Sequence, residues 1–159
     1  HQRRYAHRRG QRFVIQRAWG ACLVLASLAL SPAVPAQEAP AEPVRAVYHV
    51  FDAGDQSMRA LRNLRNHLNA DPTATLKLVA LGYGLKFLAL DAEDDNGNPY
   101  EPYVMELQDD GVTFYACANT LQALGLTGED LLPGVVVVPS GVAEIARLQT
   151  QEGYAYLRP

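Results

Sequence analysis

A β-branched and aromatic stretch, Val44-Arg-Ala-Val-Tyr-His-Val-Phe51, decides the fold, because the hydrophobic period changes directly after it. Its composition is typical of a β-strand. From Ser57 to Asn69 apolar residues recur at steps of three and four, which predicts an amphipathic helix; they are Met58, Leu61, Leu64 and Leu68. Another apolar stretch, Thr75–Leu81, predicts a second strand. A strand, a helix and a strand in this order predict a unit with two parallel strands.

The same alternation continues to the end of the chain. Further strands are expected at 112–116, 135–138 and 154–158, and the four valines of 135–138 predict a strand buried on both faces. Short helices are expected at 85–90, 103–108 and 119–124, and a longer one at 141–151 with Val142, Ile145 and Leu148 facing inward. We therefore predict an α/β fold, a three-layer α/β/α domain with a mainly parallel sheet of about five strands.

In such a fold the loops after the carboxyl ends of the strands build the functional site. Here those loops are 52–55, 82–84, 117–120 and 139–141. They bring a single cysteine, several glycines and hydroxyl or amide side chains to one edge of the sheet. We expect the site at this edge.

The first 36 residues are organised like a secretory signal peptide. Six arginines precede an apolar run at 18–30, and the small-residue site Val34-Pro-Ala36 follows it. The run is shorter than the roughly 20 residues that a membrane helix needs. We expect cleavage after Ala36 and export to the periplasm or beyond, by the general secretory route rather than the twin-arginine route. An uncleaved anchor is the alternative. Residues 37–43 then form a linker and 44–159 the folded domain.

The chain beyond the predicted leader is acidic. It holds all 17 Asp and Glu residues but only eight of the 14 Lys and Arg residues, a formal charge of −9. This charge disfavours nucleic acids and anionic membranes as partners. Arg59, Arg62 and Arg65 share one face of the predicted helix at 57–69 and can hold an anion or a partner's carboxylates, although a solvated helix face is the more common outcome.

Removal of the leader leaves one thiol, Cys117, because the other cysteine, Cys22, lies in the apolar run. A single cysteine forms no internal disulfide, so it is a buried small hydrophobe, an intermolecular linker or a reactive group. Cys117 comes just before the predicted helix at 119–124, and the positive end of a helix stabilises a thiolate. Position alone favours neither a reactive nor a structural thiol. If the thiol is reactive, Asn119 and Thr120 are the expected hydrogen-bond donors to it.

Three more residues are candidates for binding. Gly82 and Gly84 follow a predicted strand but lack the rest of a phosphate-loop signature, so a tight turn is expected, with Gly84 allowing a ligand or subunit to approach the backbone. His49 lies on the strand face opposite Tyr48 and Val50, where a pair with the cysteine or a structural role is possible. The cysteine and histidines show no zinc-ligand spacing, so no metal site is expected.

Several short motifs occur together in one order. They are Val47-Tyr-His-Val50, Asn66-His-Leu-Asn69, Asp95-Asn-Gly-Asn-Pro-Tyr100, Cys117-Ala-Asn-Thr-Leu121, Val138-Pro-Ser-Gly-Val-Ala-Glu144 and Gly153-Tyr-Ala-Tyr156. As a set, these motifs over residues 44–159 resemble the exported branch of the DsrE/DsrF-like family.

The resemblance implies an activity and an assembly. Members form homo-oligomers, often trimers or hexamers, and in well-studied relatives a cysteine carries sulfur as a persulfide between proteins. Cys117 occupies the matching position. The main expectation is therefore a sulfur carrier that needs no metal or organic cofactor and works with protein donors and acceptors. A non-catalytic oligomeric binding module and a redox-sensing thiol protein are the alternatives.

Overall fold

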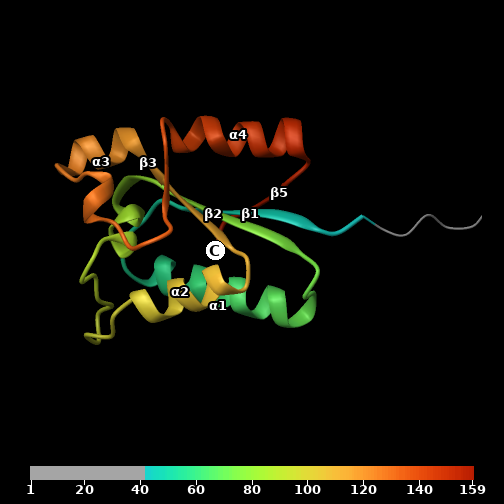
Figure 1. Cartoon of the computed structure of the whole chain (residues 1–159), viewed down its shortest axis with the longest axis horizontal. Coiled ribbons are helices and arrows are strands. Elements are labelled where there is room, and N and C mark those ends of the chain that lie inside the picture. Colours follow the sequence, from blue (N-terminus) through green and yellow to red (C-terminus); the bar gives the residue numbers. More distant parts are fainter. Residues whose placement is uncertain (1–41) are drawn as a thin grey trace, which may run out of the picture. The chain divides into compact units, whose positions relative to one another are not determined.

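The computed structural model describes residues 42–159, so the predicted signal peptide and most of the predicted linker lie outside the described residues. Strands and helices alternate along this part of the chain (Figure 1). The strands are β1 (Arg45–Val50), β2 (Thr75–Ala80), β3 (Thr113–Cys117), β4 (Val136–Val138) and β5 (Ala155–Leu157). The helices are α1 (Asp55–Ala70), α2 (Glu101–Asp109), α3 (Ala118–Leu124) and α4 (Gly141–Glu152), with two 3-10 helices, η1 (Gly82–Leu88) and η2 (Gly128–Asp130).

The five strands form one sheet in the order β4-β3-β2-β1-β5, and every neighbouring pair is parallel. Figure 1 shows α1 and α2 together on one face of this sheet and α4 on the other. The predicted α/β fold with a parallel sheet of about five strands is thus confirmed. Among the described residues, no helix is both long enough and apolar enough to cross a membrane.

The two faces of the sheet bury two separate hydrophobic clusters. The larger contains residues of α1 and α2, among them Leu64 with no exposed surface, and the fully buried Phe114 of β3. The smaller lies beneath α4 and contains Val47, Val79, Leu81, Cys117, Ile145, Leu148 and Tyr154. Full burial of a side chain such as Leu64 stabilises the fold by about 1.5–3 kcal/mol. Cys117 is therefore packed on the α4 face of the sheet.

The structure corrects three local predictions. β4 is an edge strand, so Val136 and Val137 are 43% and 42% exposed and the strand is not buried on both faces. Val142 was expected to face inward but is 61% exposed, whereas Ile145 and Leu148 are buried as predicted. The helix expected at 85–90 is the 3-10 helix η1, which begins earlier, at Gly82.

Candidate functional site

Cys117 lies where two neighbouring strands send their connections to opposite faces of the sheet. It is the last residue of β3 and pairs in register with Val138, the last residue of β4. The helix after β3 packs Leu121 into the larger cluster, while the helix after β4 packs Ile145 into the smaller one. In open α/β sheets, divergence of two adjacent connections creates the crevice in which ligands bind.

The N-termini of both helices converge on the sulfur of Cys117. This residue is the N-cap of α3, and Gly141 opens α4. Burial of the thiol, which is 5% exposed, raises its pKa. The N–H groups of Gly141, Thr120 and Asn119 and the Thr120 hydroxyl lie near the sulfur and favour its anionic form, and together they bring the pKa of Cys117 below the usual cysteine value. The site thus favours a thiolate through backbone dipoles.

The close approach of α4 to the cysteine depends on Gly141. A Cβ at this position would lie 3.2 Å from the Cβ of Cys117 and 3.1 Å from Cδ2 of Leu81. A side chain at this position would therefore require Leu81, Cys117 or the first turn of α4 to shift by a few tenths of an ångström. The loop 139–141 was predicted to border the site, but Gly141 was not recognised as a hydrogen-bond donor, because a backbone N–H leaves no signal in side-chain chemistry.

Gly82 and Gly84 support the site from the next strand. The N–H of Gly82 donates to Oγ1 of Thr120 at 3.0 Å, and this bond ties the end of β2 to the first turn of α3. A Cβ on Gly84 would lie 2.8 Å from the carbonyl carbon of Phe51, and Gly82 has a φ of +56°. Both glycines therefore allow the start of η1 to pack on the end of β1. The structure thus links Gly82 to Thr120 and Cys117, and places Gly84 beside β1.

His49 is not part of this cluster. Its Nδ1 lies 2.7 Å from the hydroxyl of Tyr156 on β5, and its buried Nε2 has no hydrogen-bond partner among residues 42–159. Burial lowers the pKa of His49, the charge of Arg158 lowers it further, and that of Asp52 opposes the shift. His49 is absent from the groups that shift the pKa of Cys117. The structure thus provides no Cys–His pair.

Three large apolar side chains are exposed next to the residues that build the site. Phe51, Tyr83 and Val142 are 45%, 65% and 61% exposed. Each is adjacent in sequence or space to a glycine of the site, since Gly82 packs on Phe51 and Val142 follows Gly141. We call these three residues the apolar rim. Large apolar side chains that remain exposed near a site are candidates for contact with a partner.

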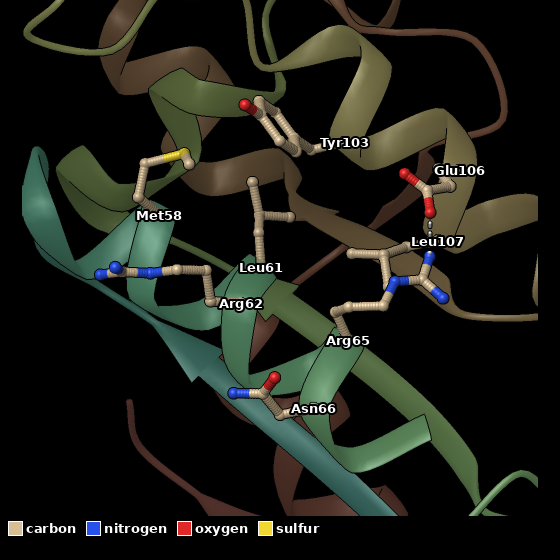
Figure 2. A pocket seen from close by; sticks show the side chains of 8 residues that line it. All are labelled: Met58, Leu61, Arg62, Arg65, Asn66, Tyr103, Glu106 and Leu107. Carbon is tan, nitrogen blue, oxygen red and sulfur yellow. Dashed lines mark ion pairs between the residues drawn. The ribbon is translucent and has the colours of Figure 1, made fainter. Parts of the chain in front are cut away.

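The arginines of α1 lie on the other face of the sheet. Arg65 forms an ion pair with Glu106 of α2 at 3.0 Å (Figure 2). A groove of about 280 Å³ lies beside this pair, between the two helices. Arg59 pairs with Asp55 at 3.6 Å, and Arg62 lines the groove with Leu61 and Tyr103. Part of the arginine face thus fastens α2 to α1, and none of it reaches Cys117, which packs on the α4 face.

Metal chemistry finds no support in the described region. Residues 42–159 contain no group of three or more His, Cys, Asp or Glu side chains placed to hold a metal ion. What the arrangement around Cys117 does provide is a stabilised sulfur anion and donors that can hold a second anionic atom bonded to it.

Comparison with known proteins identifies the family of this chain. The profile of the DsrE/DsrF-like family matches residues 45–159, so the chain belongs to that family. A protein of unknown function from Methanobacterium thermoautotrophicum, MTH1491, is 40% identical in sequence; the match covers 73% of this chain and 99% of that one, with a TM-score of 0.65.

A more distant structure supports the fold alone. The ychN protein from E. coli is 15% identical, with 75% of this chain and 100% of that one covered and a TM-score of 0.59. Comparison with curated proteins gave no match. The comparisons therefore establish the family and the fold, and leave the activity to be argued from the site.

Proposed function

We propose that this protein is an exported sulfur carrier that holds a persulfide on Cys117. The observation that supports this most strongly is the convergence of the backbone N–H groups of Gly141, Thr120 and Asn119 on Cys117, whose effect on the pKa of the thiol outweighs that of burial. A thiol that served only as core packing would gain nothing from such donors, since a neutral S–H is a weak acceptor. Membership of the DsrE/DsrF-like family supports the same activity.

The reaction needs no external oxidant. The Cys117 thiolate attacks the terminal sulfur of a donor persulfide, R–S–SH; a new S–S bond forms, the donor S–S bond breaks, and R–S⁻ leaves with the electron pair. Cys117 then carries –S–SH. An acceptor thiolate attacks that outer sulfur, takes it as its own persulfide, and releases Cys117 as a thiolate. The same backbone donors stabilise the anion at the start and at the end of the cycle.

The apolar rim supports an interaction at the mouth of this site. Phe51, Tyr83 and Val142 are exposed, uncharged and next to the elements that hold Cys117. We propose that a second subunit of a homo-oligomer, a trimer or hexamer, or a donor or acceptor protein covers them during the reaction. The predicted leader at 1–36 would place this exchange in the periplasm or outside the cell.

One observation favours a second candidate function. Cys117 is only 5% exposed, which suits a structural thiol in an oligomeric binding module better than a nucleophile that must meet large partners. The two functions differ in whether a small electrophile reaches the sulfur, and in whether the sulfur is anionic near neutral pH.

The test is to incubate the purified protein with a polysulfide and measure its intact mass. The persulfide proposal expects the addition of one sulfur atom that a reductant removes, in the wild type and in Cys22→Ser, but not in Cys117→Ser. The circular dichroism of Cys117→Ser should match that of the wild type. If no sulfur is added, and iodoacetamide also leaves Cys117 unmodified at neutral pH, the thiol is structural and the binding module is the better account.

A further inference from the structure

The edge strand β5 is attached to the rest of the sheet through few interactions. It is three residues long, all of them exposed, and it pairs with β1 alone. Side-chain contacts also hold the segment 155–159: Tyr156 to His49 at 2.7 Å, Arg158 to Asp52 at 3.0 Å, and Gln56 to the carbonyl of Pro159 at 3.4 Å. Elements with few buried contacts are the ones that open locally while the rest of a fold stays intact.

His49 joins β1 to β5 in a way that suits a neutral ring. Its Nδ1 lies 2.7 Å from the hydroxyl of Tyr156, and the ring of Phe51 packs edge-on against it at 6.2 Å. The other ring nitrogen, Nε2, is buried and has no hydrogen-bond partner among residues 42–159. In a protonated ring both nitrogens carry N–H groups. Protonation would therefore leave a charged donor at Nε2 buried without an acceptor, which is costly.

The charged groups around His49 do not compensate for this cost. Burial lowers the pKa of His49, the charge of Arg158 lowers it further, and the opposing charge of Asp52 does not reverse the shift. The carboxylate of Asp52 is itself paired with Arg158 at 3.0 Å. The charged residues of α4 that lie on this face pair with one another and with Lys77 of β2, and none of them shifts the pKa of His49; they are Glu144, Arg147 and Glu152.

Opening of β5 would remove both obstacles to protonation. Water would reach the ring of His49 and accept a hydrogen bond from Nε2, and Arg158 would move away with the strand. The closed form binds the proton more weakly than such an open form, since the pKa of His49 is lowered in the closed form. The closed form is therefore fully favoured above the ordinary histidine pKa, and this preference declines as the pH falls toward the lowered value.

We propose that β5 is an acid-sensitive edge strand, which detaches from β1 when His49 takes up a proton. β2 and β3 have a neighbouring strand on both sides, so the opening is confined to the β5 edge. Detachment leaves the backbone edge of β1 unpaired, close to Phe51 of the apolar rim, and an unpaired edge accepts a strand from another chain. The proposal does not depend on the chemistry of Cys117.

The test is amide hydrogen exchange of the purified protein, followed by NMR from about pH 8 to about pH 5. Protection factors are compared, because they correct for the intrinsic pH dependence of exchange. The hydrogen-bonded amides of the β1–β5 pair should be at least about tenfold less protected than those of β2 and β3 at every pH, as local opening requires. Their protection should also fall at least about threefold on acidification, because protonation of His49 favours the open form by up to about tenfold per pH unit.

Three variants assign the effect to His49. His49→Gln should make the protection of the β1–β5 pair independent of pH in this range. His67→Gln is the matched control and should keep the wild-type pH dependence, since His67 lies 2.9 Å from the hydroxyl of Tyr48 on the α1 face. Tyr156 is 40% exposed, so Tyr156→Phe should fold, and loss of its bond to His49 should lower the protection of the pair at about pH 8 at least about twofold.

Four results would each overturn the proposal. They are protection of the β1–β5 pair that does not change with pH, protection equal to that of β2 and β3, a pH dependence that survives in His49→Gln, and wild-type protection in Tyr156→Phe. The last variant keeps the proposal testable even if His49→Gln changes the fold.

Discussion

Replacement of Thr120 by valine tests how the site holds its thiolate. Oγ1 of Thr120 accepts a hydrogen bond from the N–H of Gly82 at 3.0 Å, and the Thr120 hydroxyl helps to lower the pKa of Cys117. Valine keeps the branched shape of threonine but removes both interactions. Serine at this position keeps the hydroxyl and loses only a methyl group, so Thr120→Ser is the matched control.

Thr120→Val should have two separate effects, one on the ionisation of Cys117 and one on the unfolding free energy. A hydrogen bond to a charged group contributes about 1.5–3 kcal/mol, so loss of the Thr120 hydroxyl should lower the acid dissociation constant of Cys117 by about tenfold or more. Loss of the acceptor leaves the N–H of Gly82 unpaired, which costs about 1–3 kcal/mol when fully buried. Because Gly82 and Thr120 are only half-buried, we expect the lower end, about 1 kcal/mol of unfolding free energy.

The assay is the pH dependence of iodoacetamide alkylation at Cys117, with urea unfolding measured in parallel. Thr120→Val should shift the alkylation profile to higher pH and lower the rate near neutrality, while Thr120→Ser should follow the wild type. Since the folded-state pKa of Cys117 lies below the ordinary value, the thiolate also stabilises the fold at pH values above that pKa. An unchanged alkylation profile in a folded Thr120→Val protein would refute this account of the site.

Four further substitutions probe the framework, each followed by denaturant unfolding. Leu64→Ala should lower the unfolding free energy by about 2–5 kcal/mol because Leu64 has no exposed surface. Val142 is 61% exposed, so Val142→Ala should change the unfolding free energy by less than about 0.5 kcal/mol. Similar losses for both would mean that the core is misplaced. Gly84→Ala should cost at least about 1–3 kcal/mol, because the new Cβ meets the backbone of Phe51 at 2.8 Å, and a neutral result would contradict that packing. Hydrogen bonds from Arg147 lower the pKa of Glu144, so the Glu144 carboxylate stabilises the fold above its ordinary pKa, and this effect is lost as the pH falls through the lowered value. Glu144→Gln should therefore be less stable than the wild type at pH 7 and equally stable in strong acid. A difference in unfolding free energy that persisted in acid would argue against the ion pair.

The sequence predicts the fold well where the hydrophobic period is long and regular. The stripe on α1 could be recognised because Leu61 and Leu64 recur at helical spacing, and both are buried. β4 shows where this reasoning stops, since an apolar run of valines does not reveal whether its strand lies in the middle or at the edge of a sheet. Strand order depends on contacts distant in sequence, and β4 pairs only with β3.

The sequence predicts only the part of the site whose residues are close together in the chain. Cys117, Thr120 and Asn119 are close in sequence, so their proximity could be anticipated from one strand end and one helix start. Gly141 contributes a backbone N–H from 24 positions further along the chain, and only the packing of α4 beside β3 brings it to the sulfur. His49 shows another case, because its strand position left both a pair with Cys117 and a structural role open, and its ring pairs with Tyr156 of β5.

The most direct test of the central claim is the transfer of sulfur from loaded protein to a second thiol. The protein is loaded with a polysulfide, separated from excess donor, and mixed with a thiol-containing acceptor peptide, and the intact masses of both are followed over time. The sulfur-carrier account predicts that Cys117 loses one sulfur atom as the acceptor gains it, with Cys117→Ser inactive. A loaded protein that keeps its sulfur, or a wild type that is never loaded, would contradict the account.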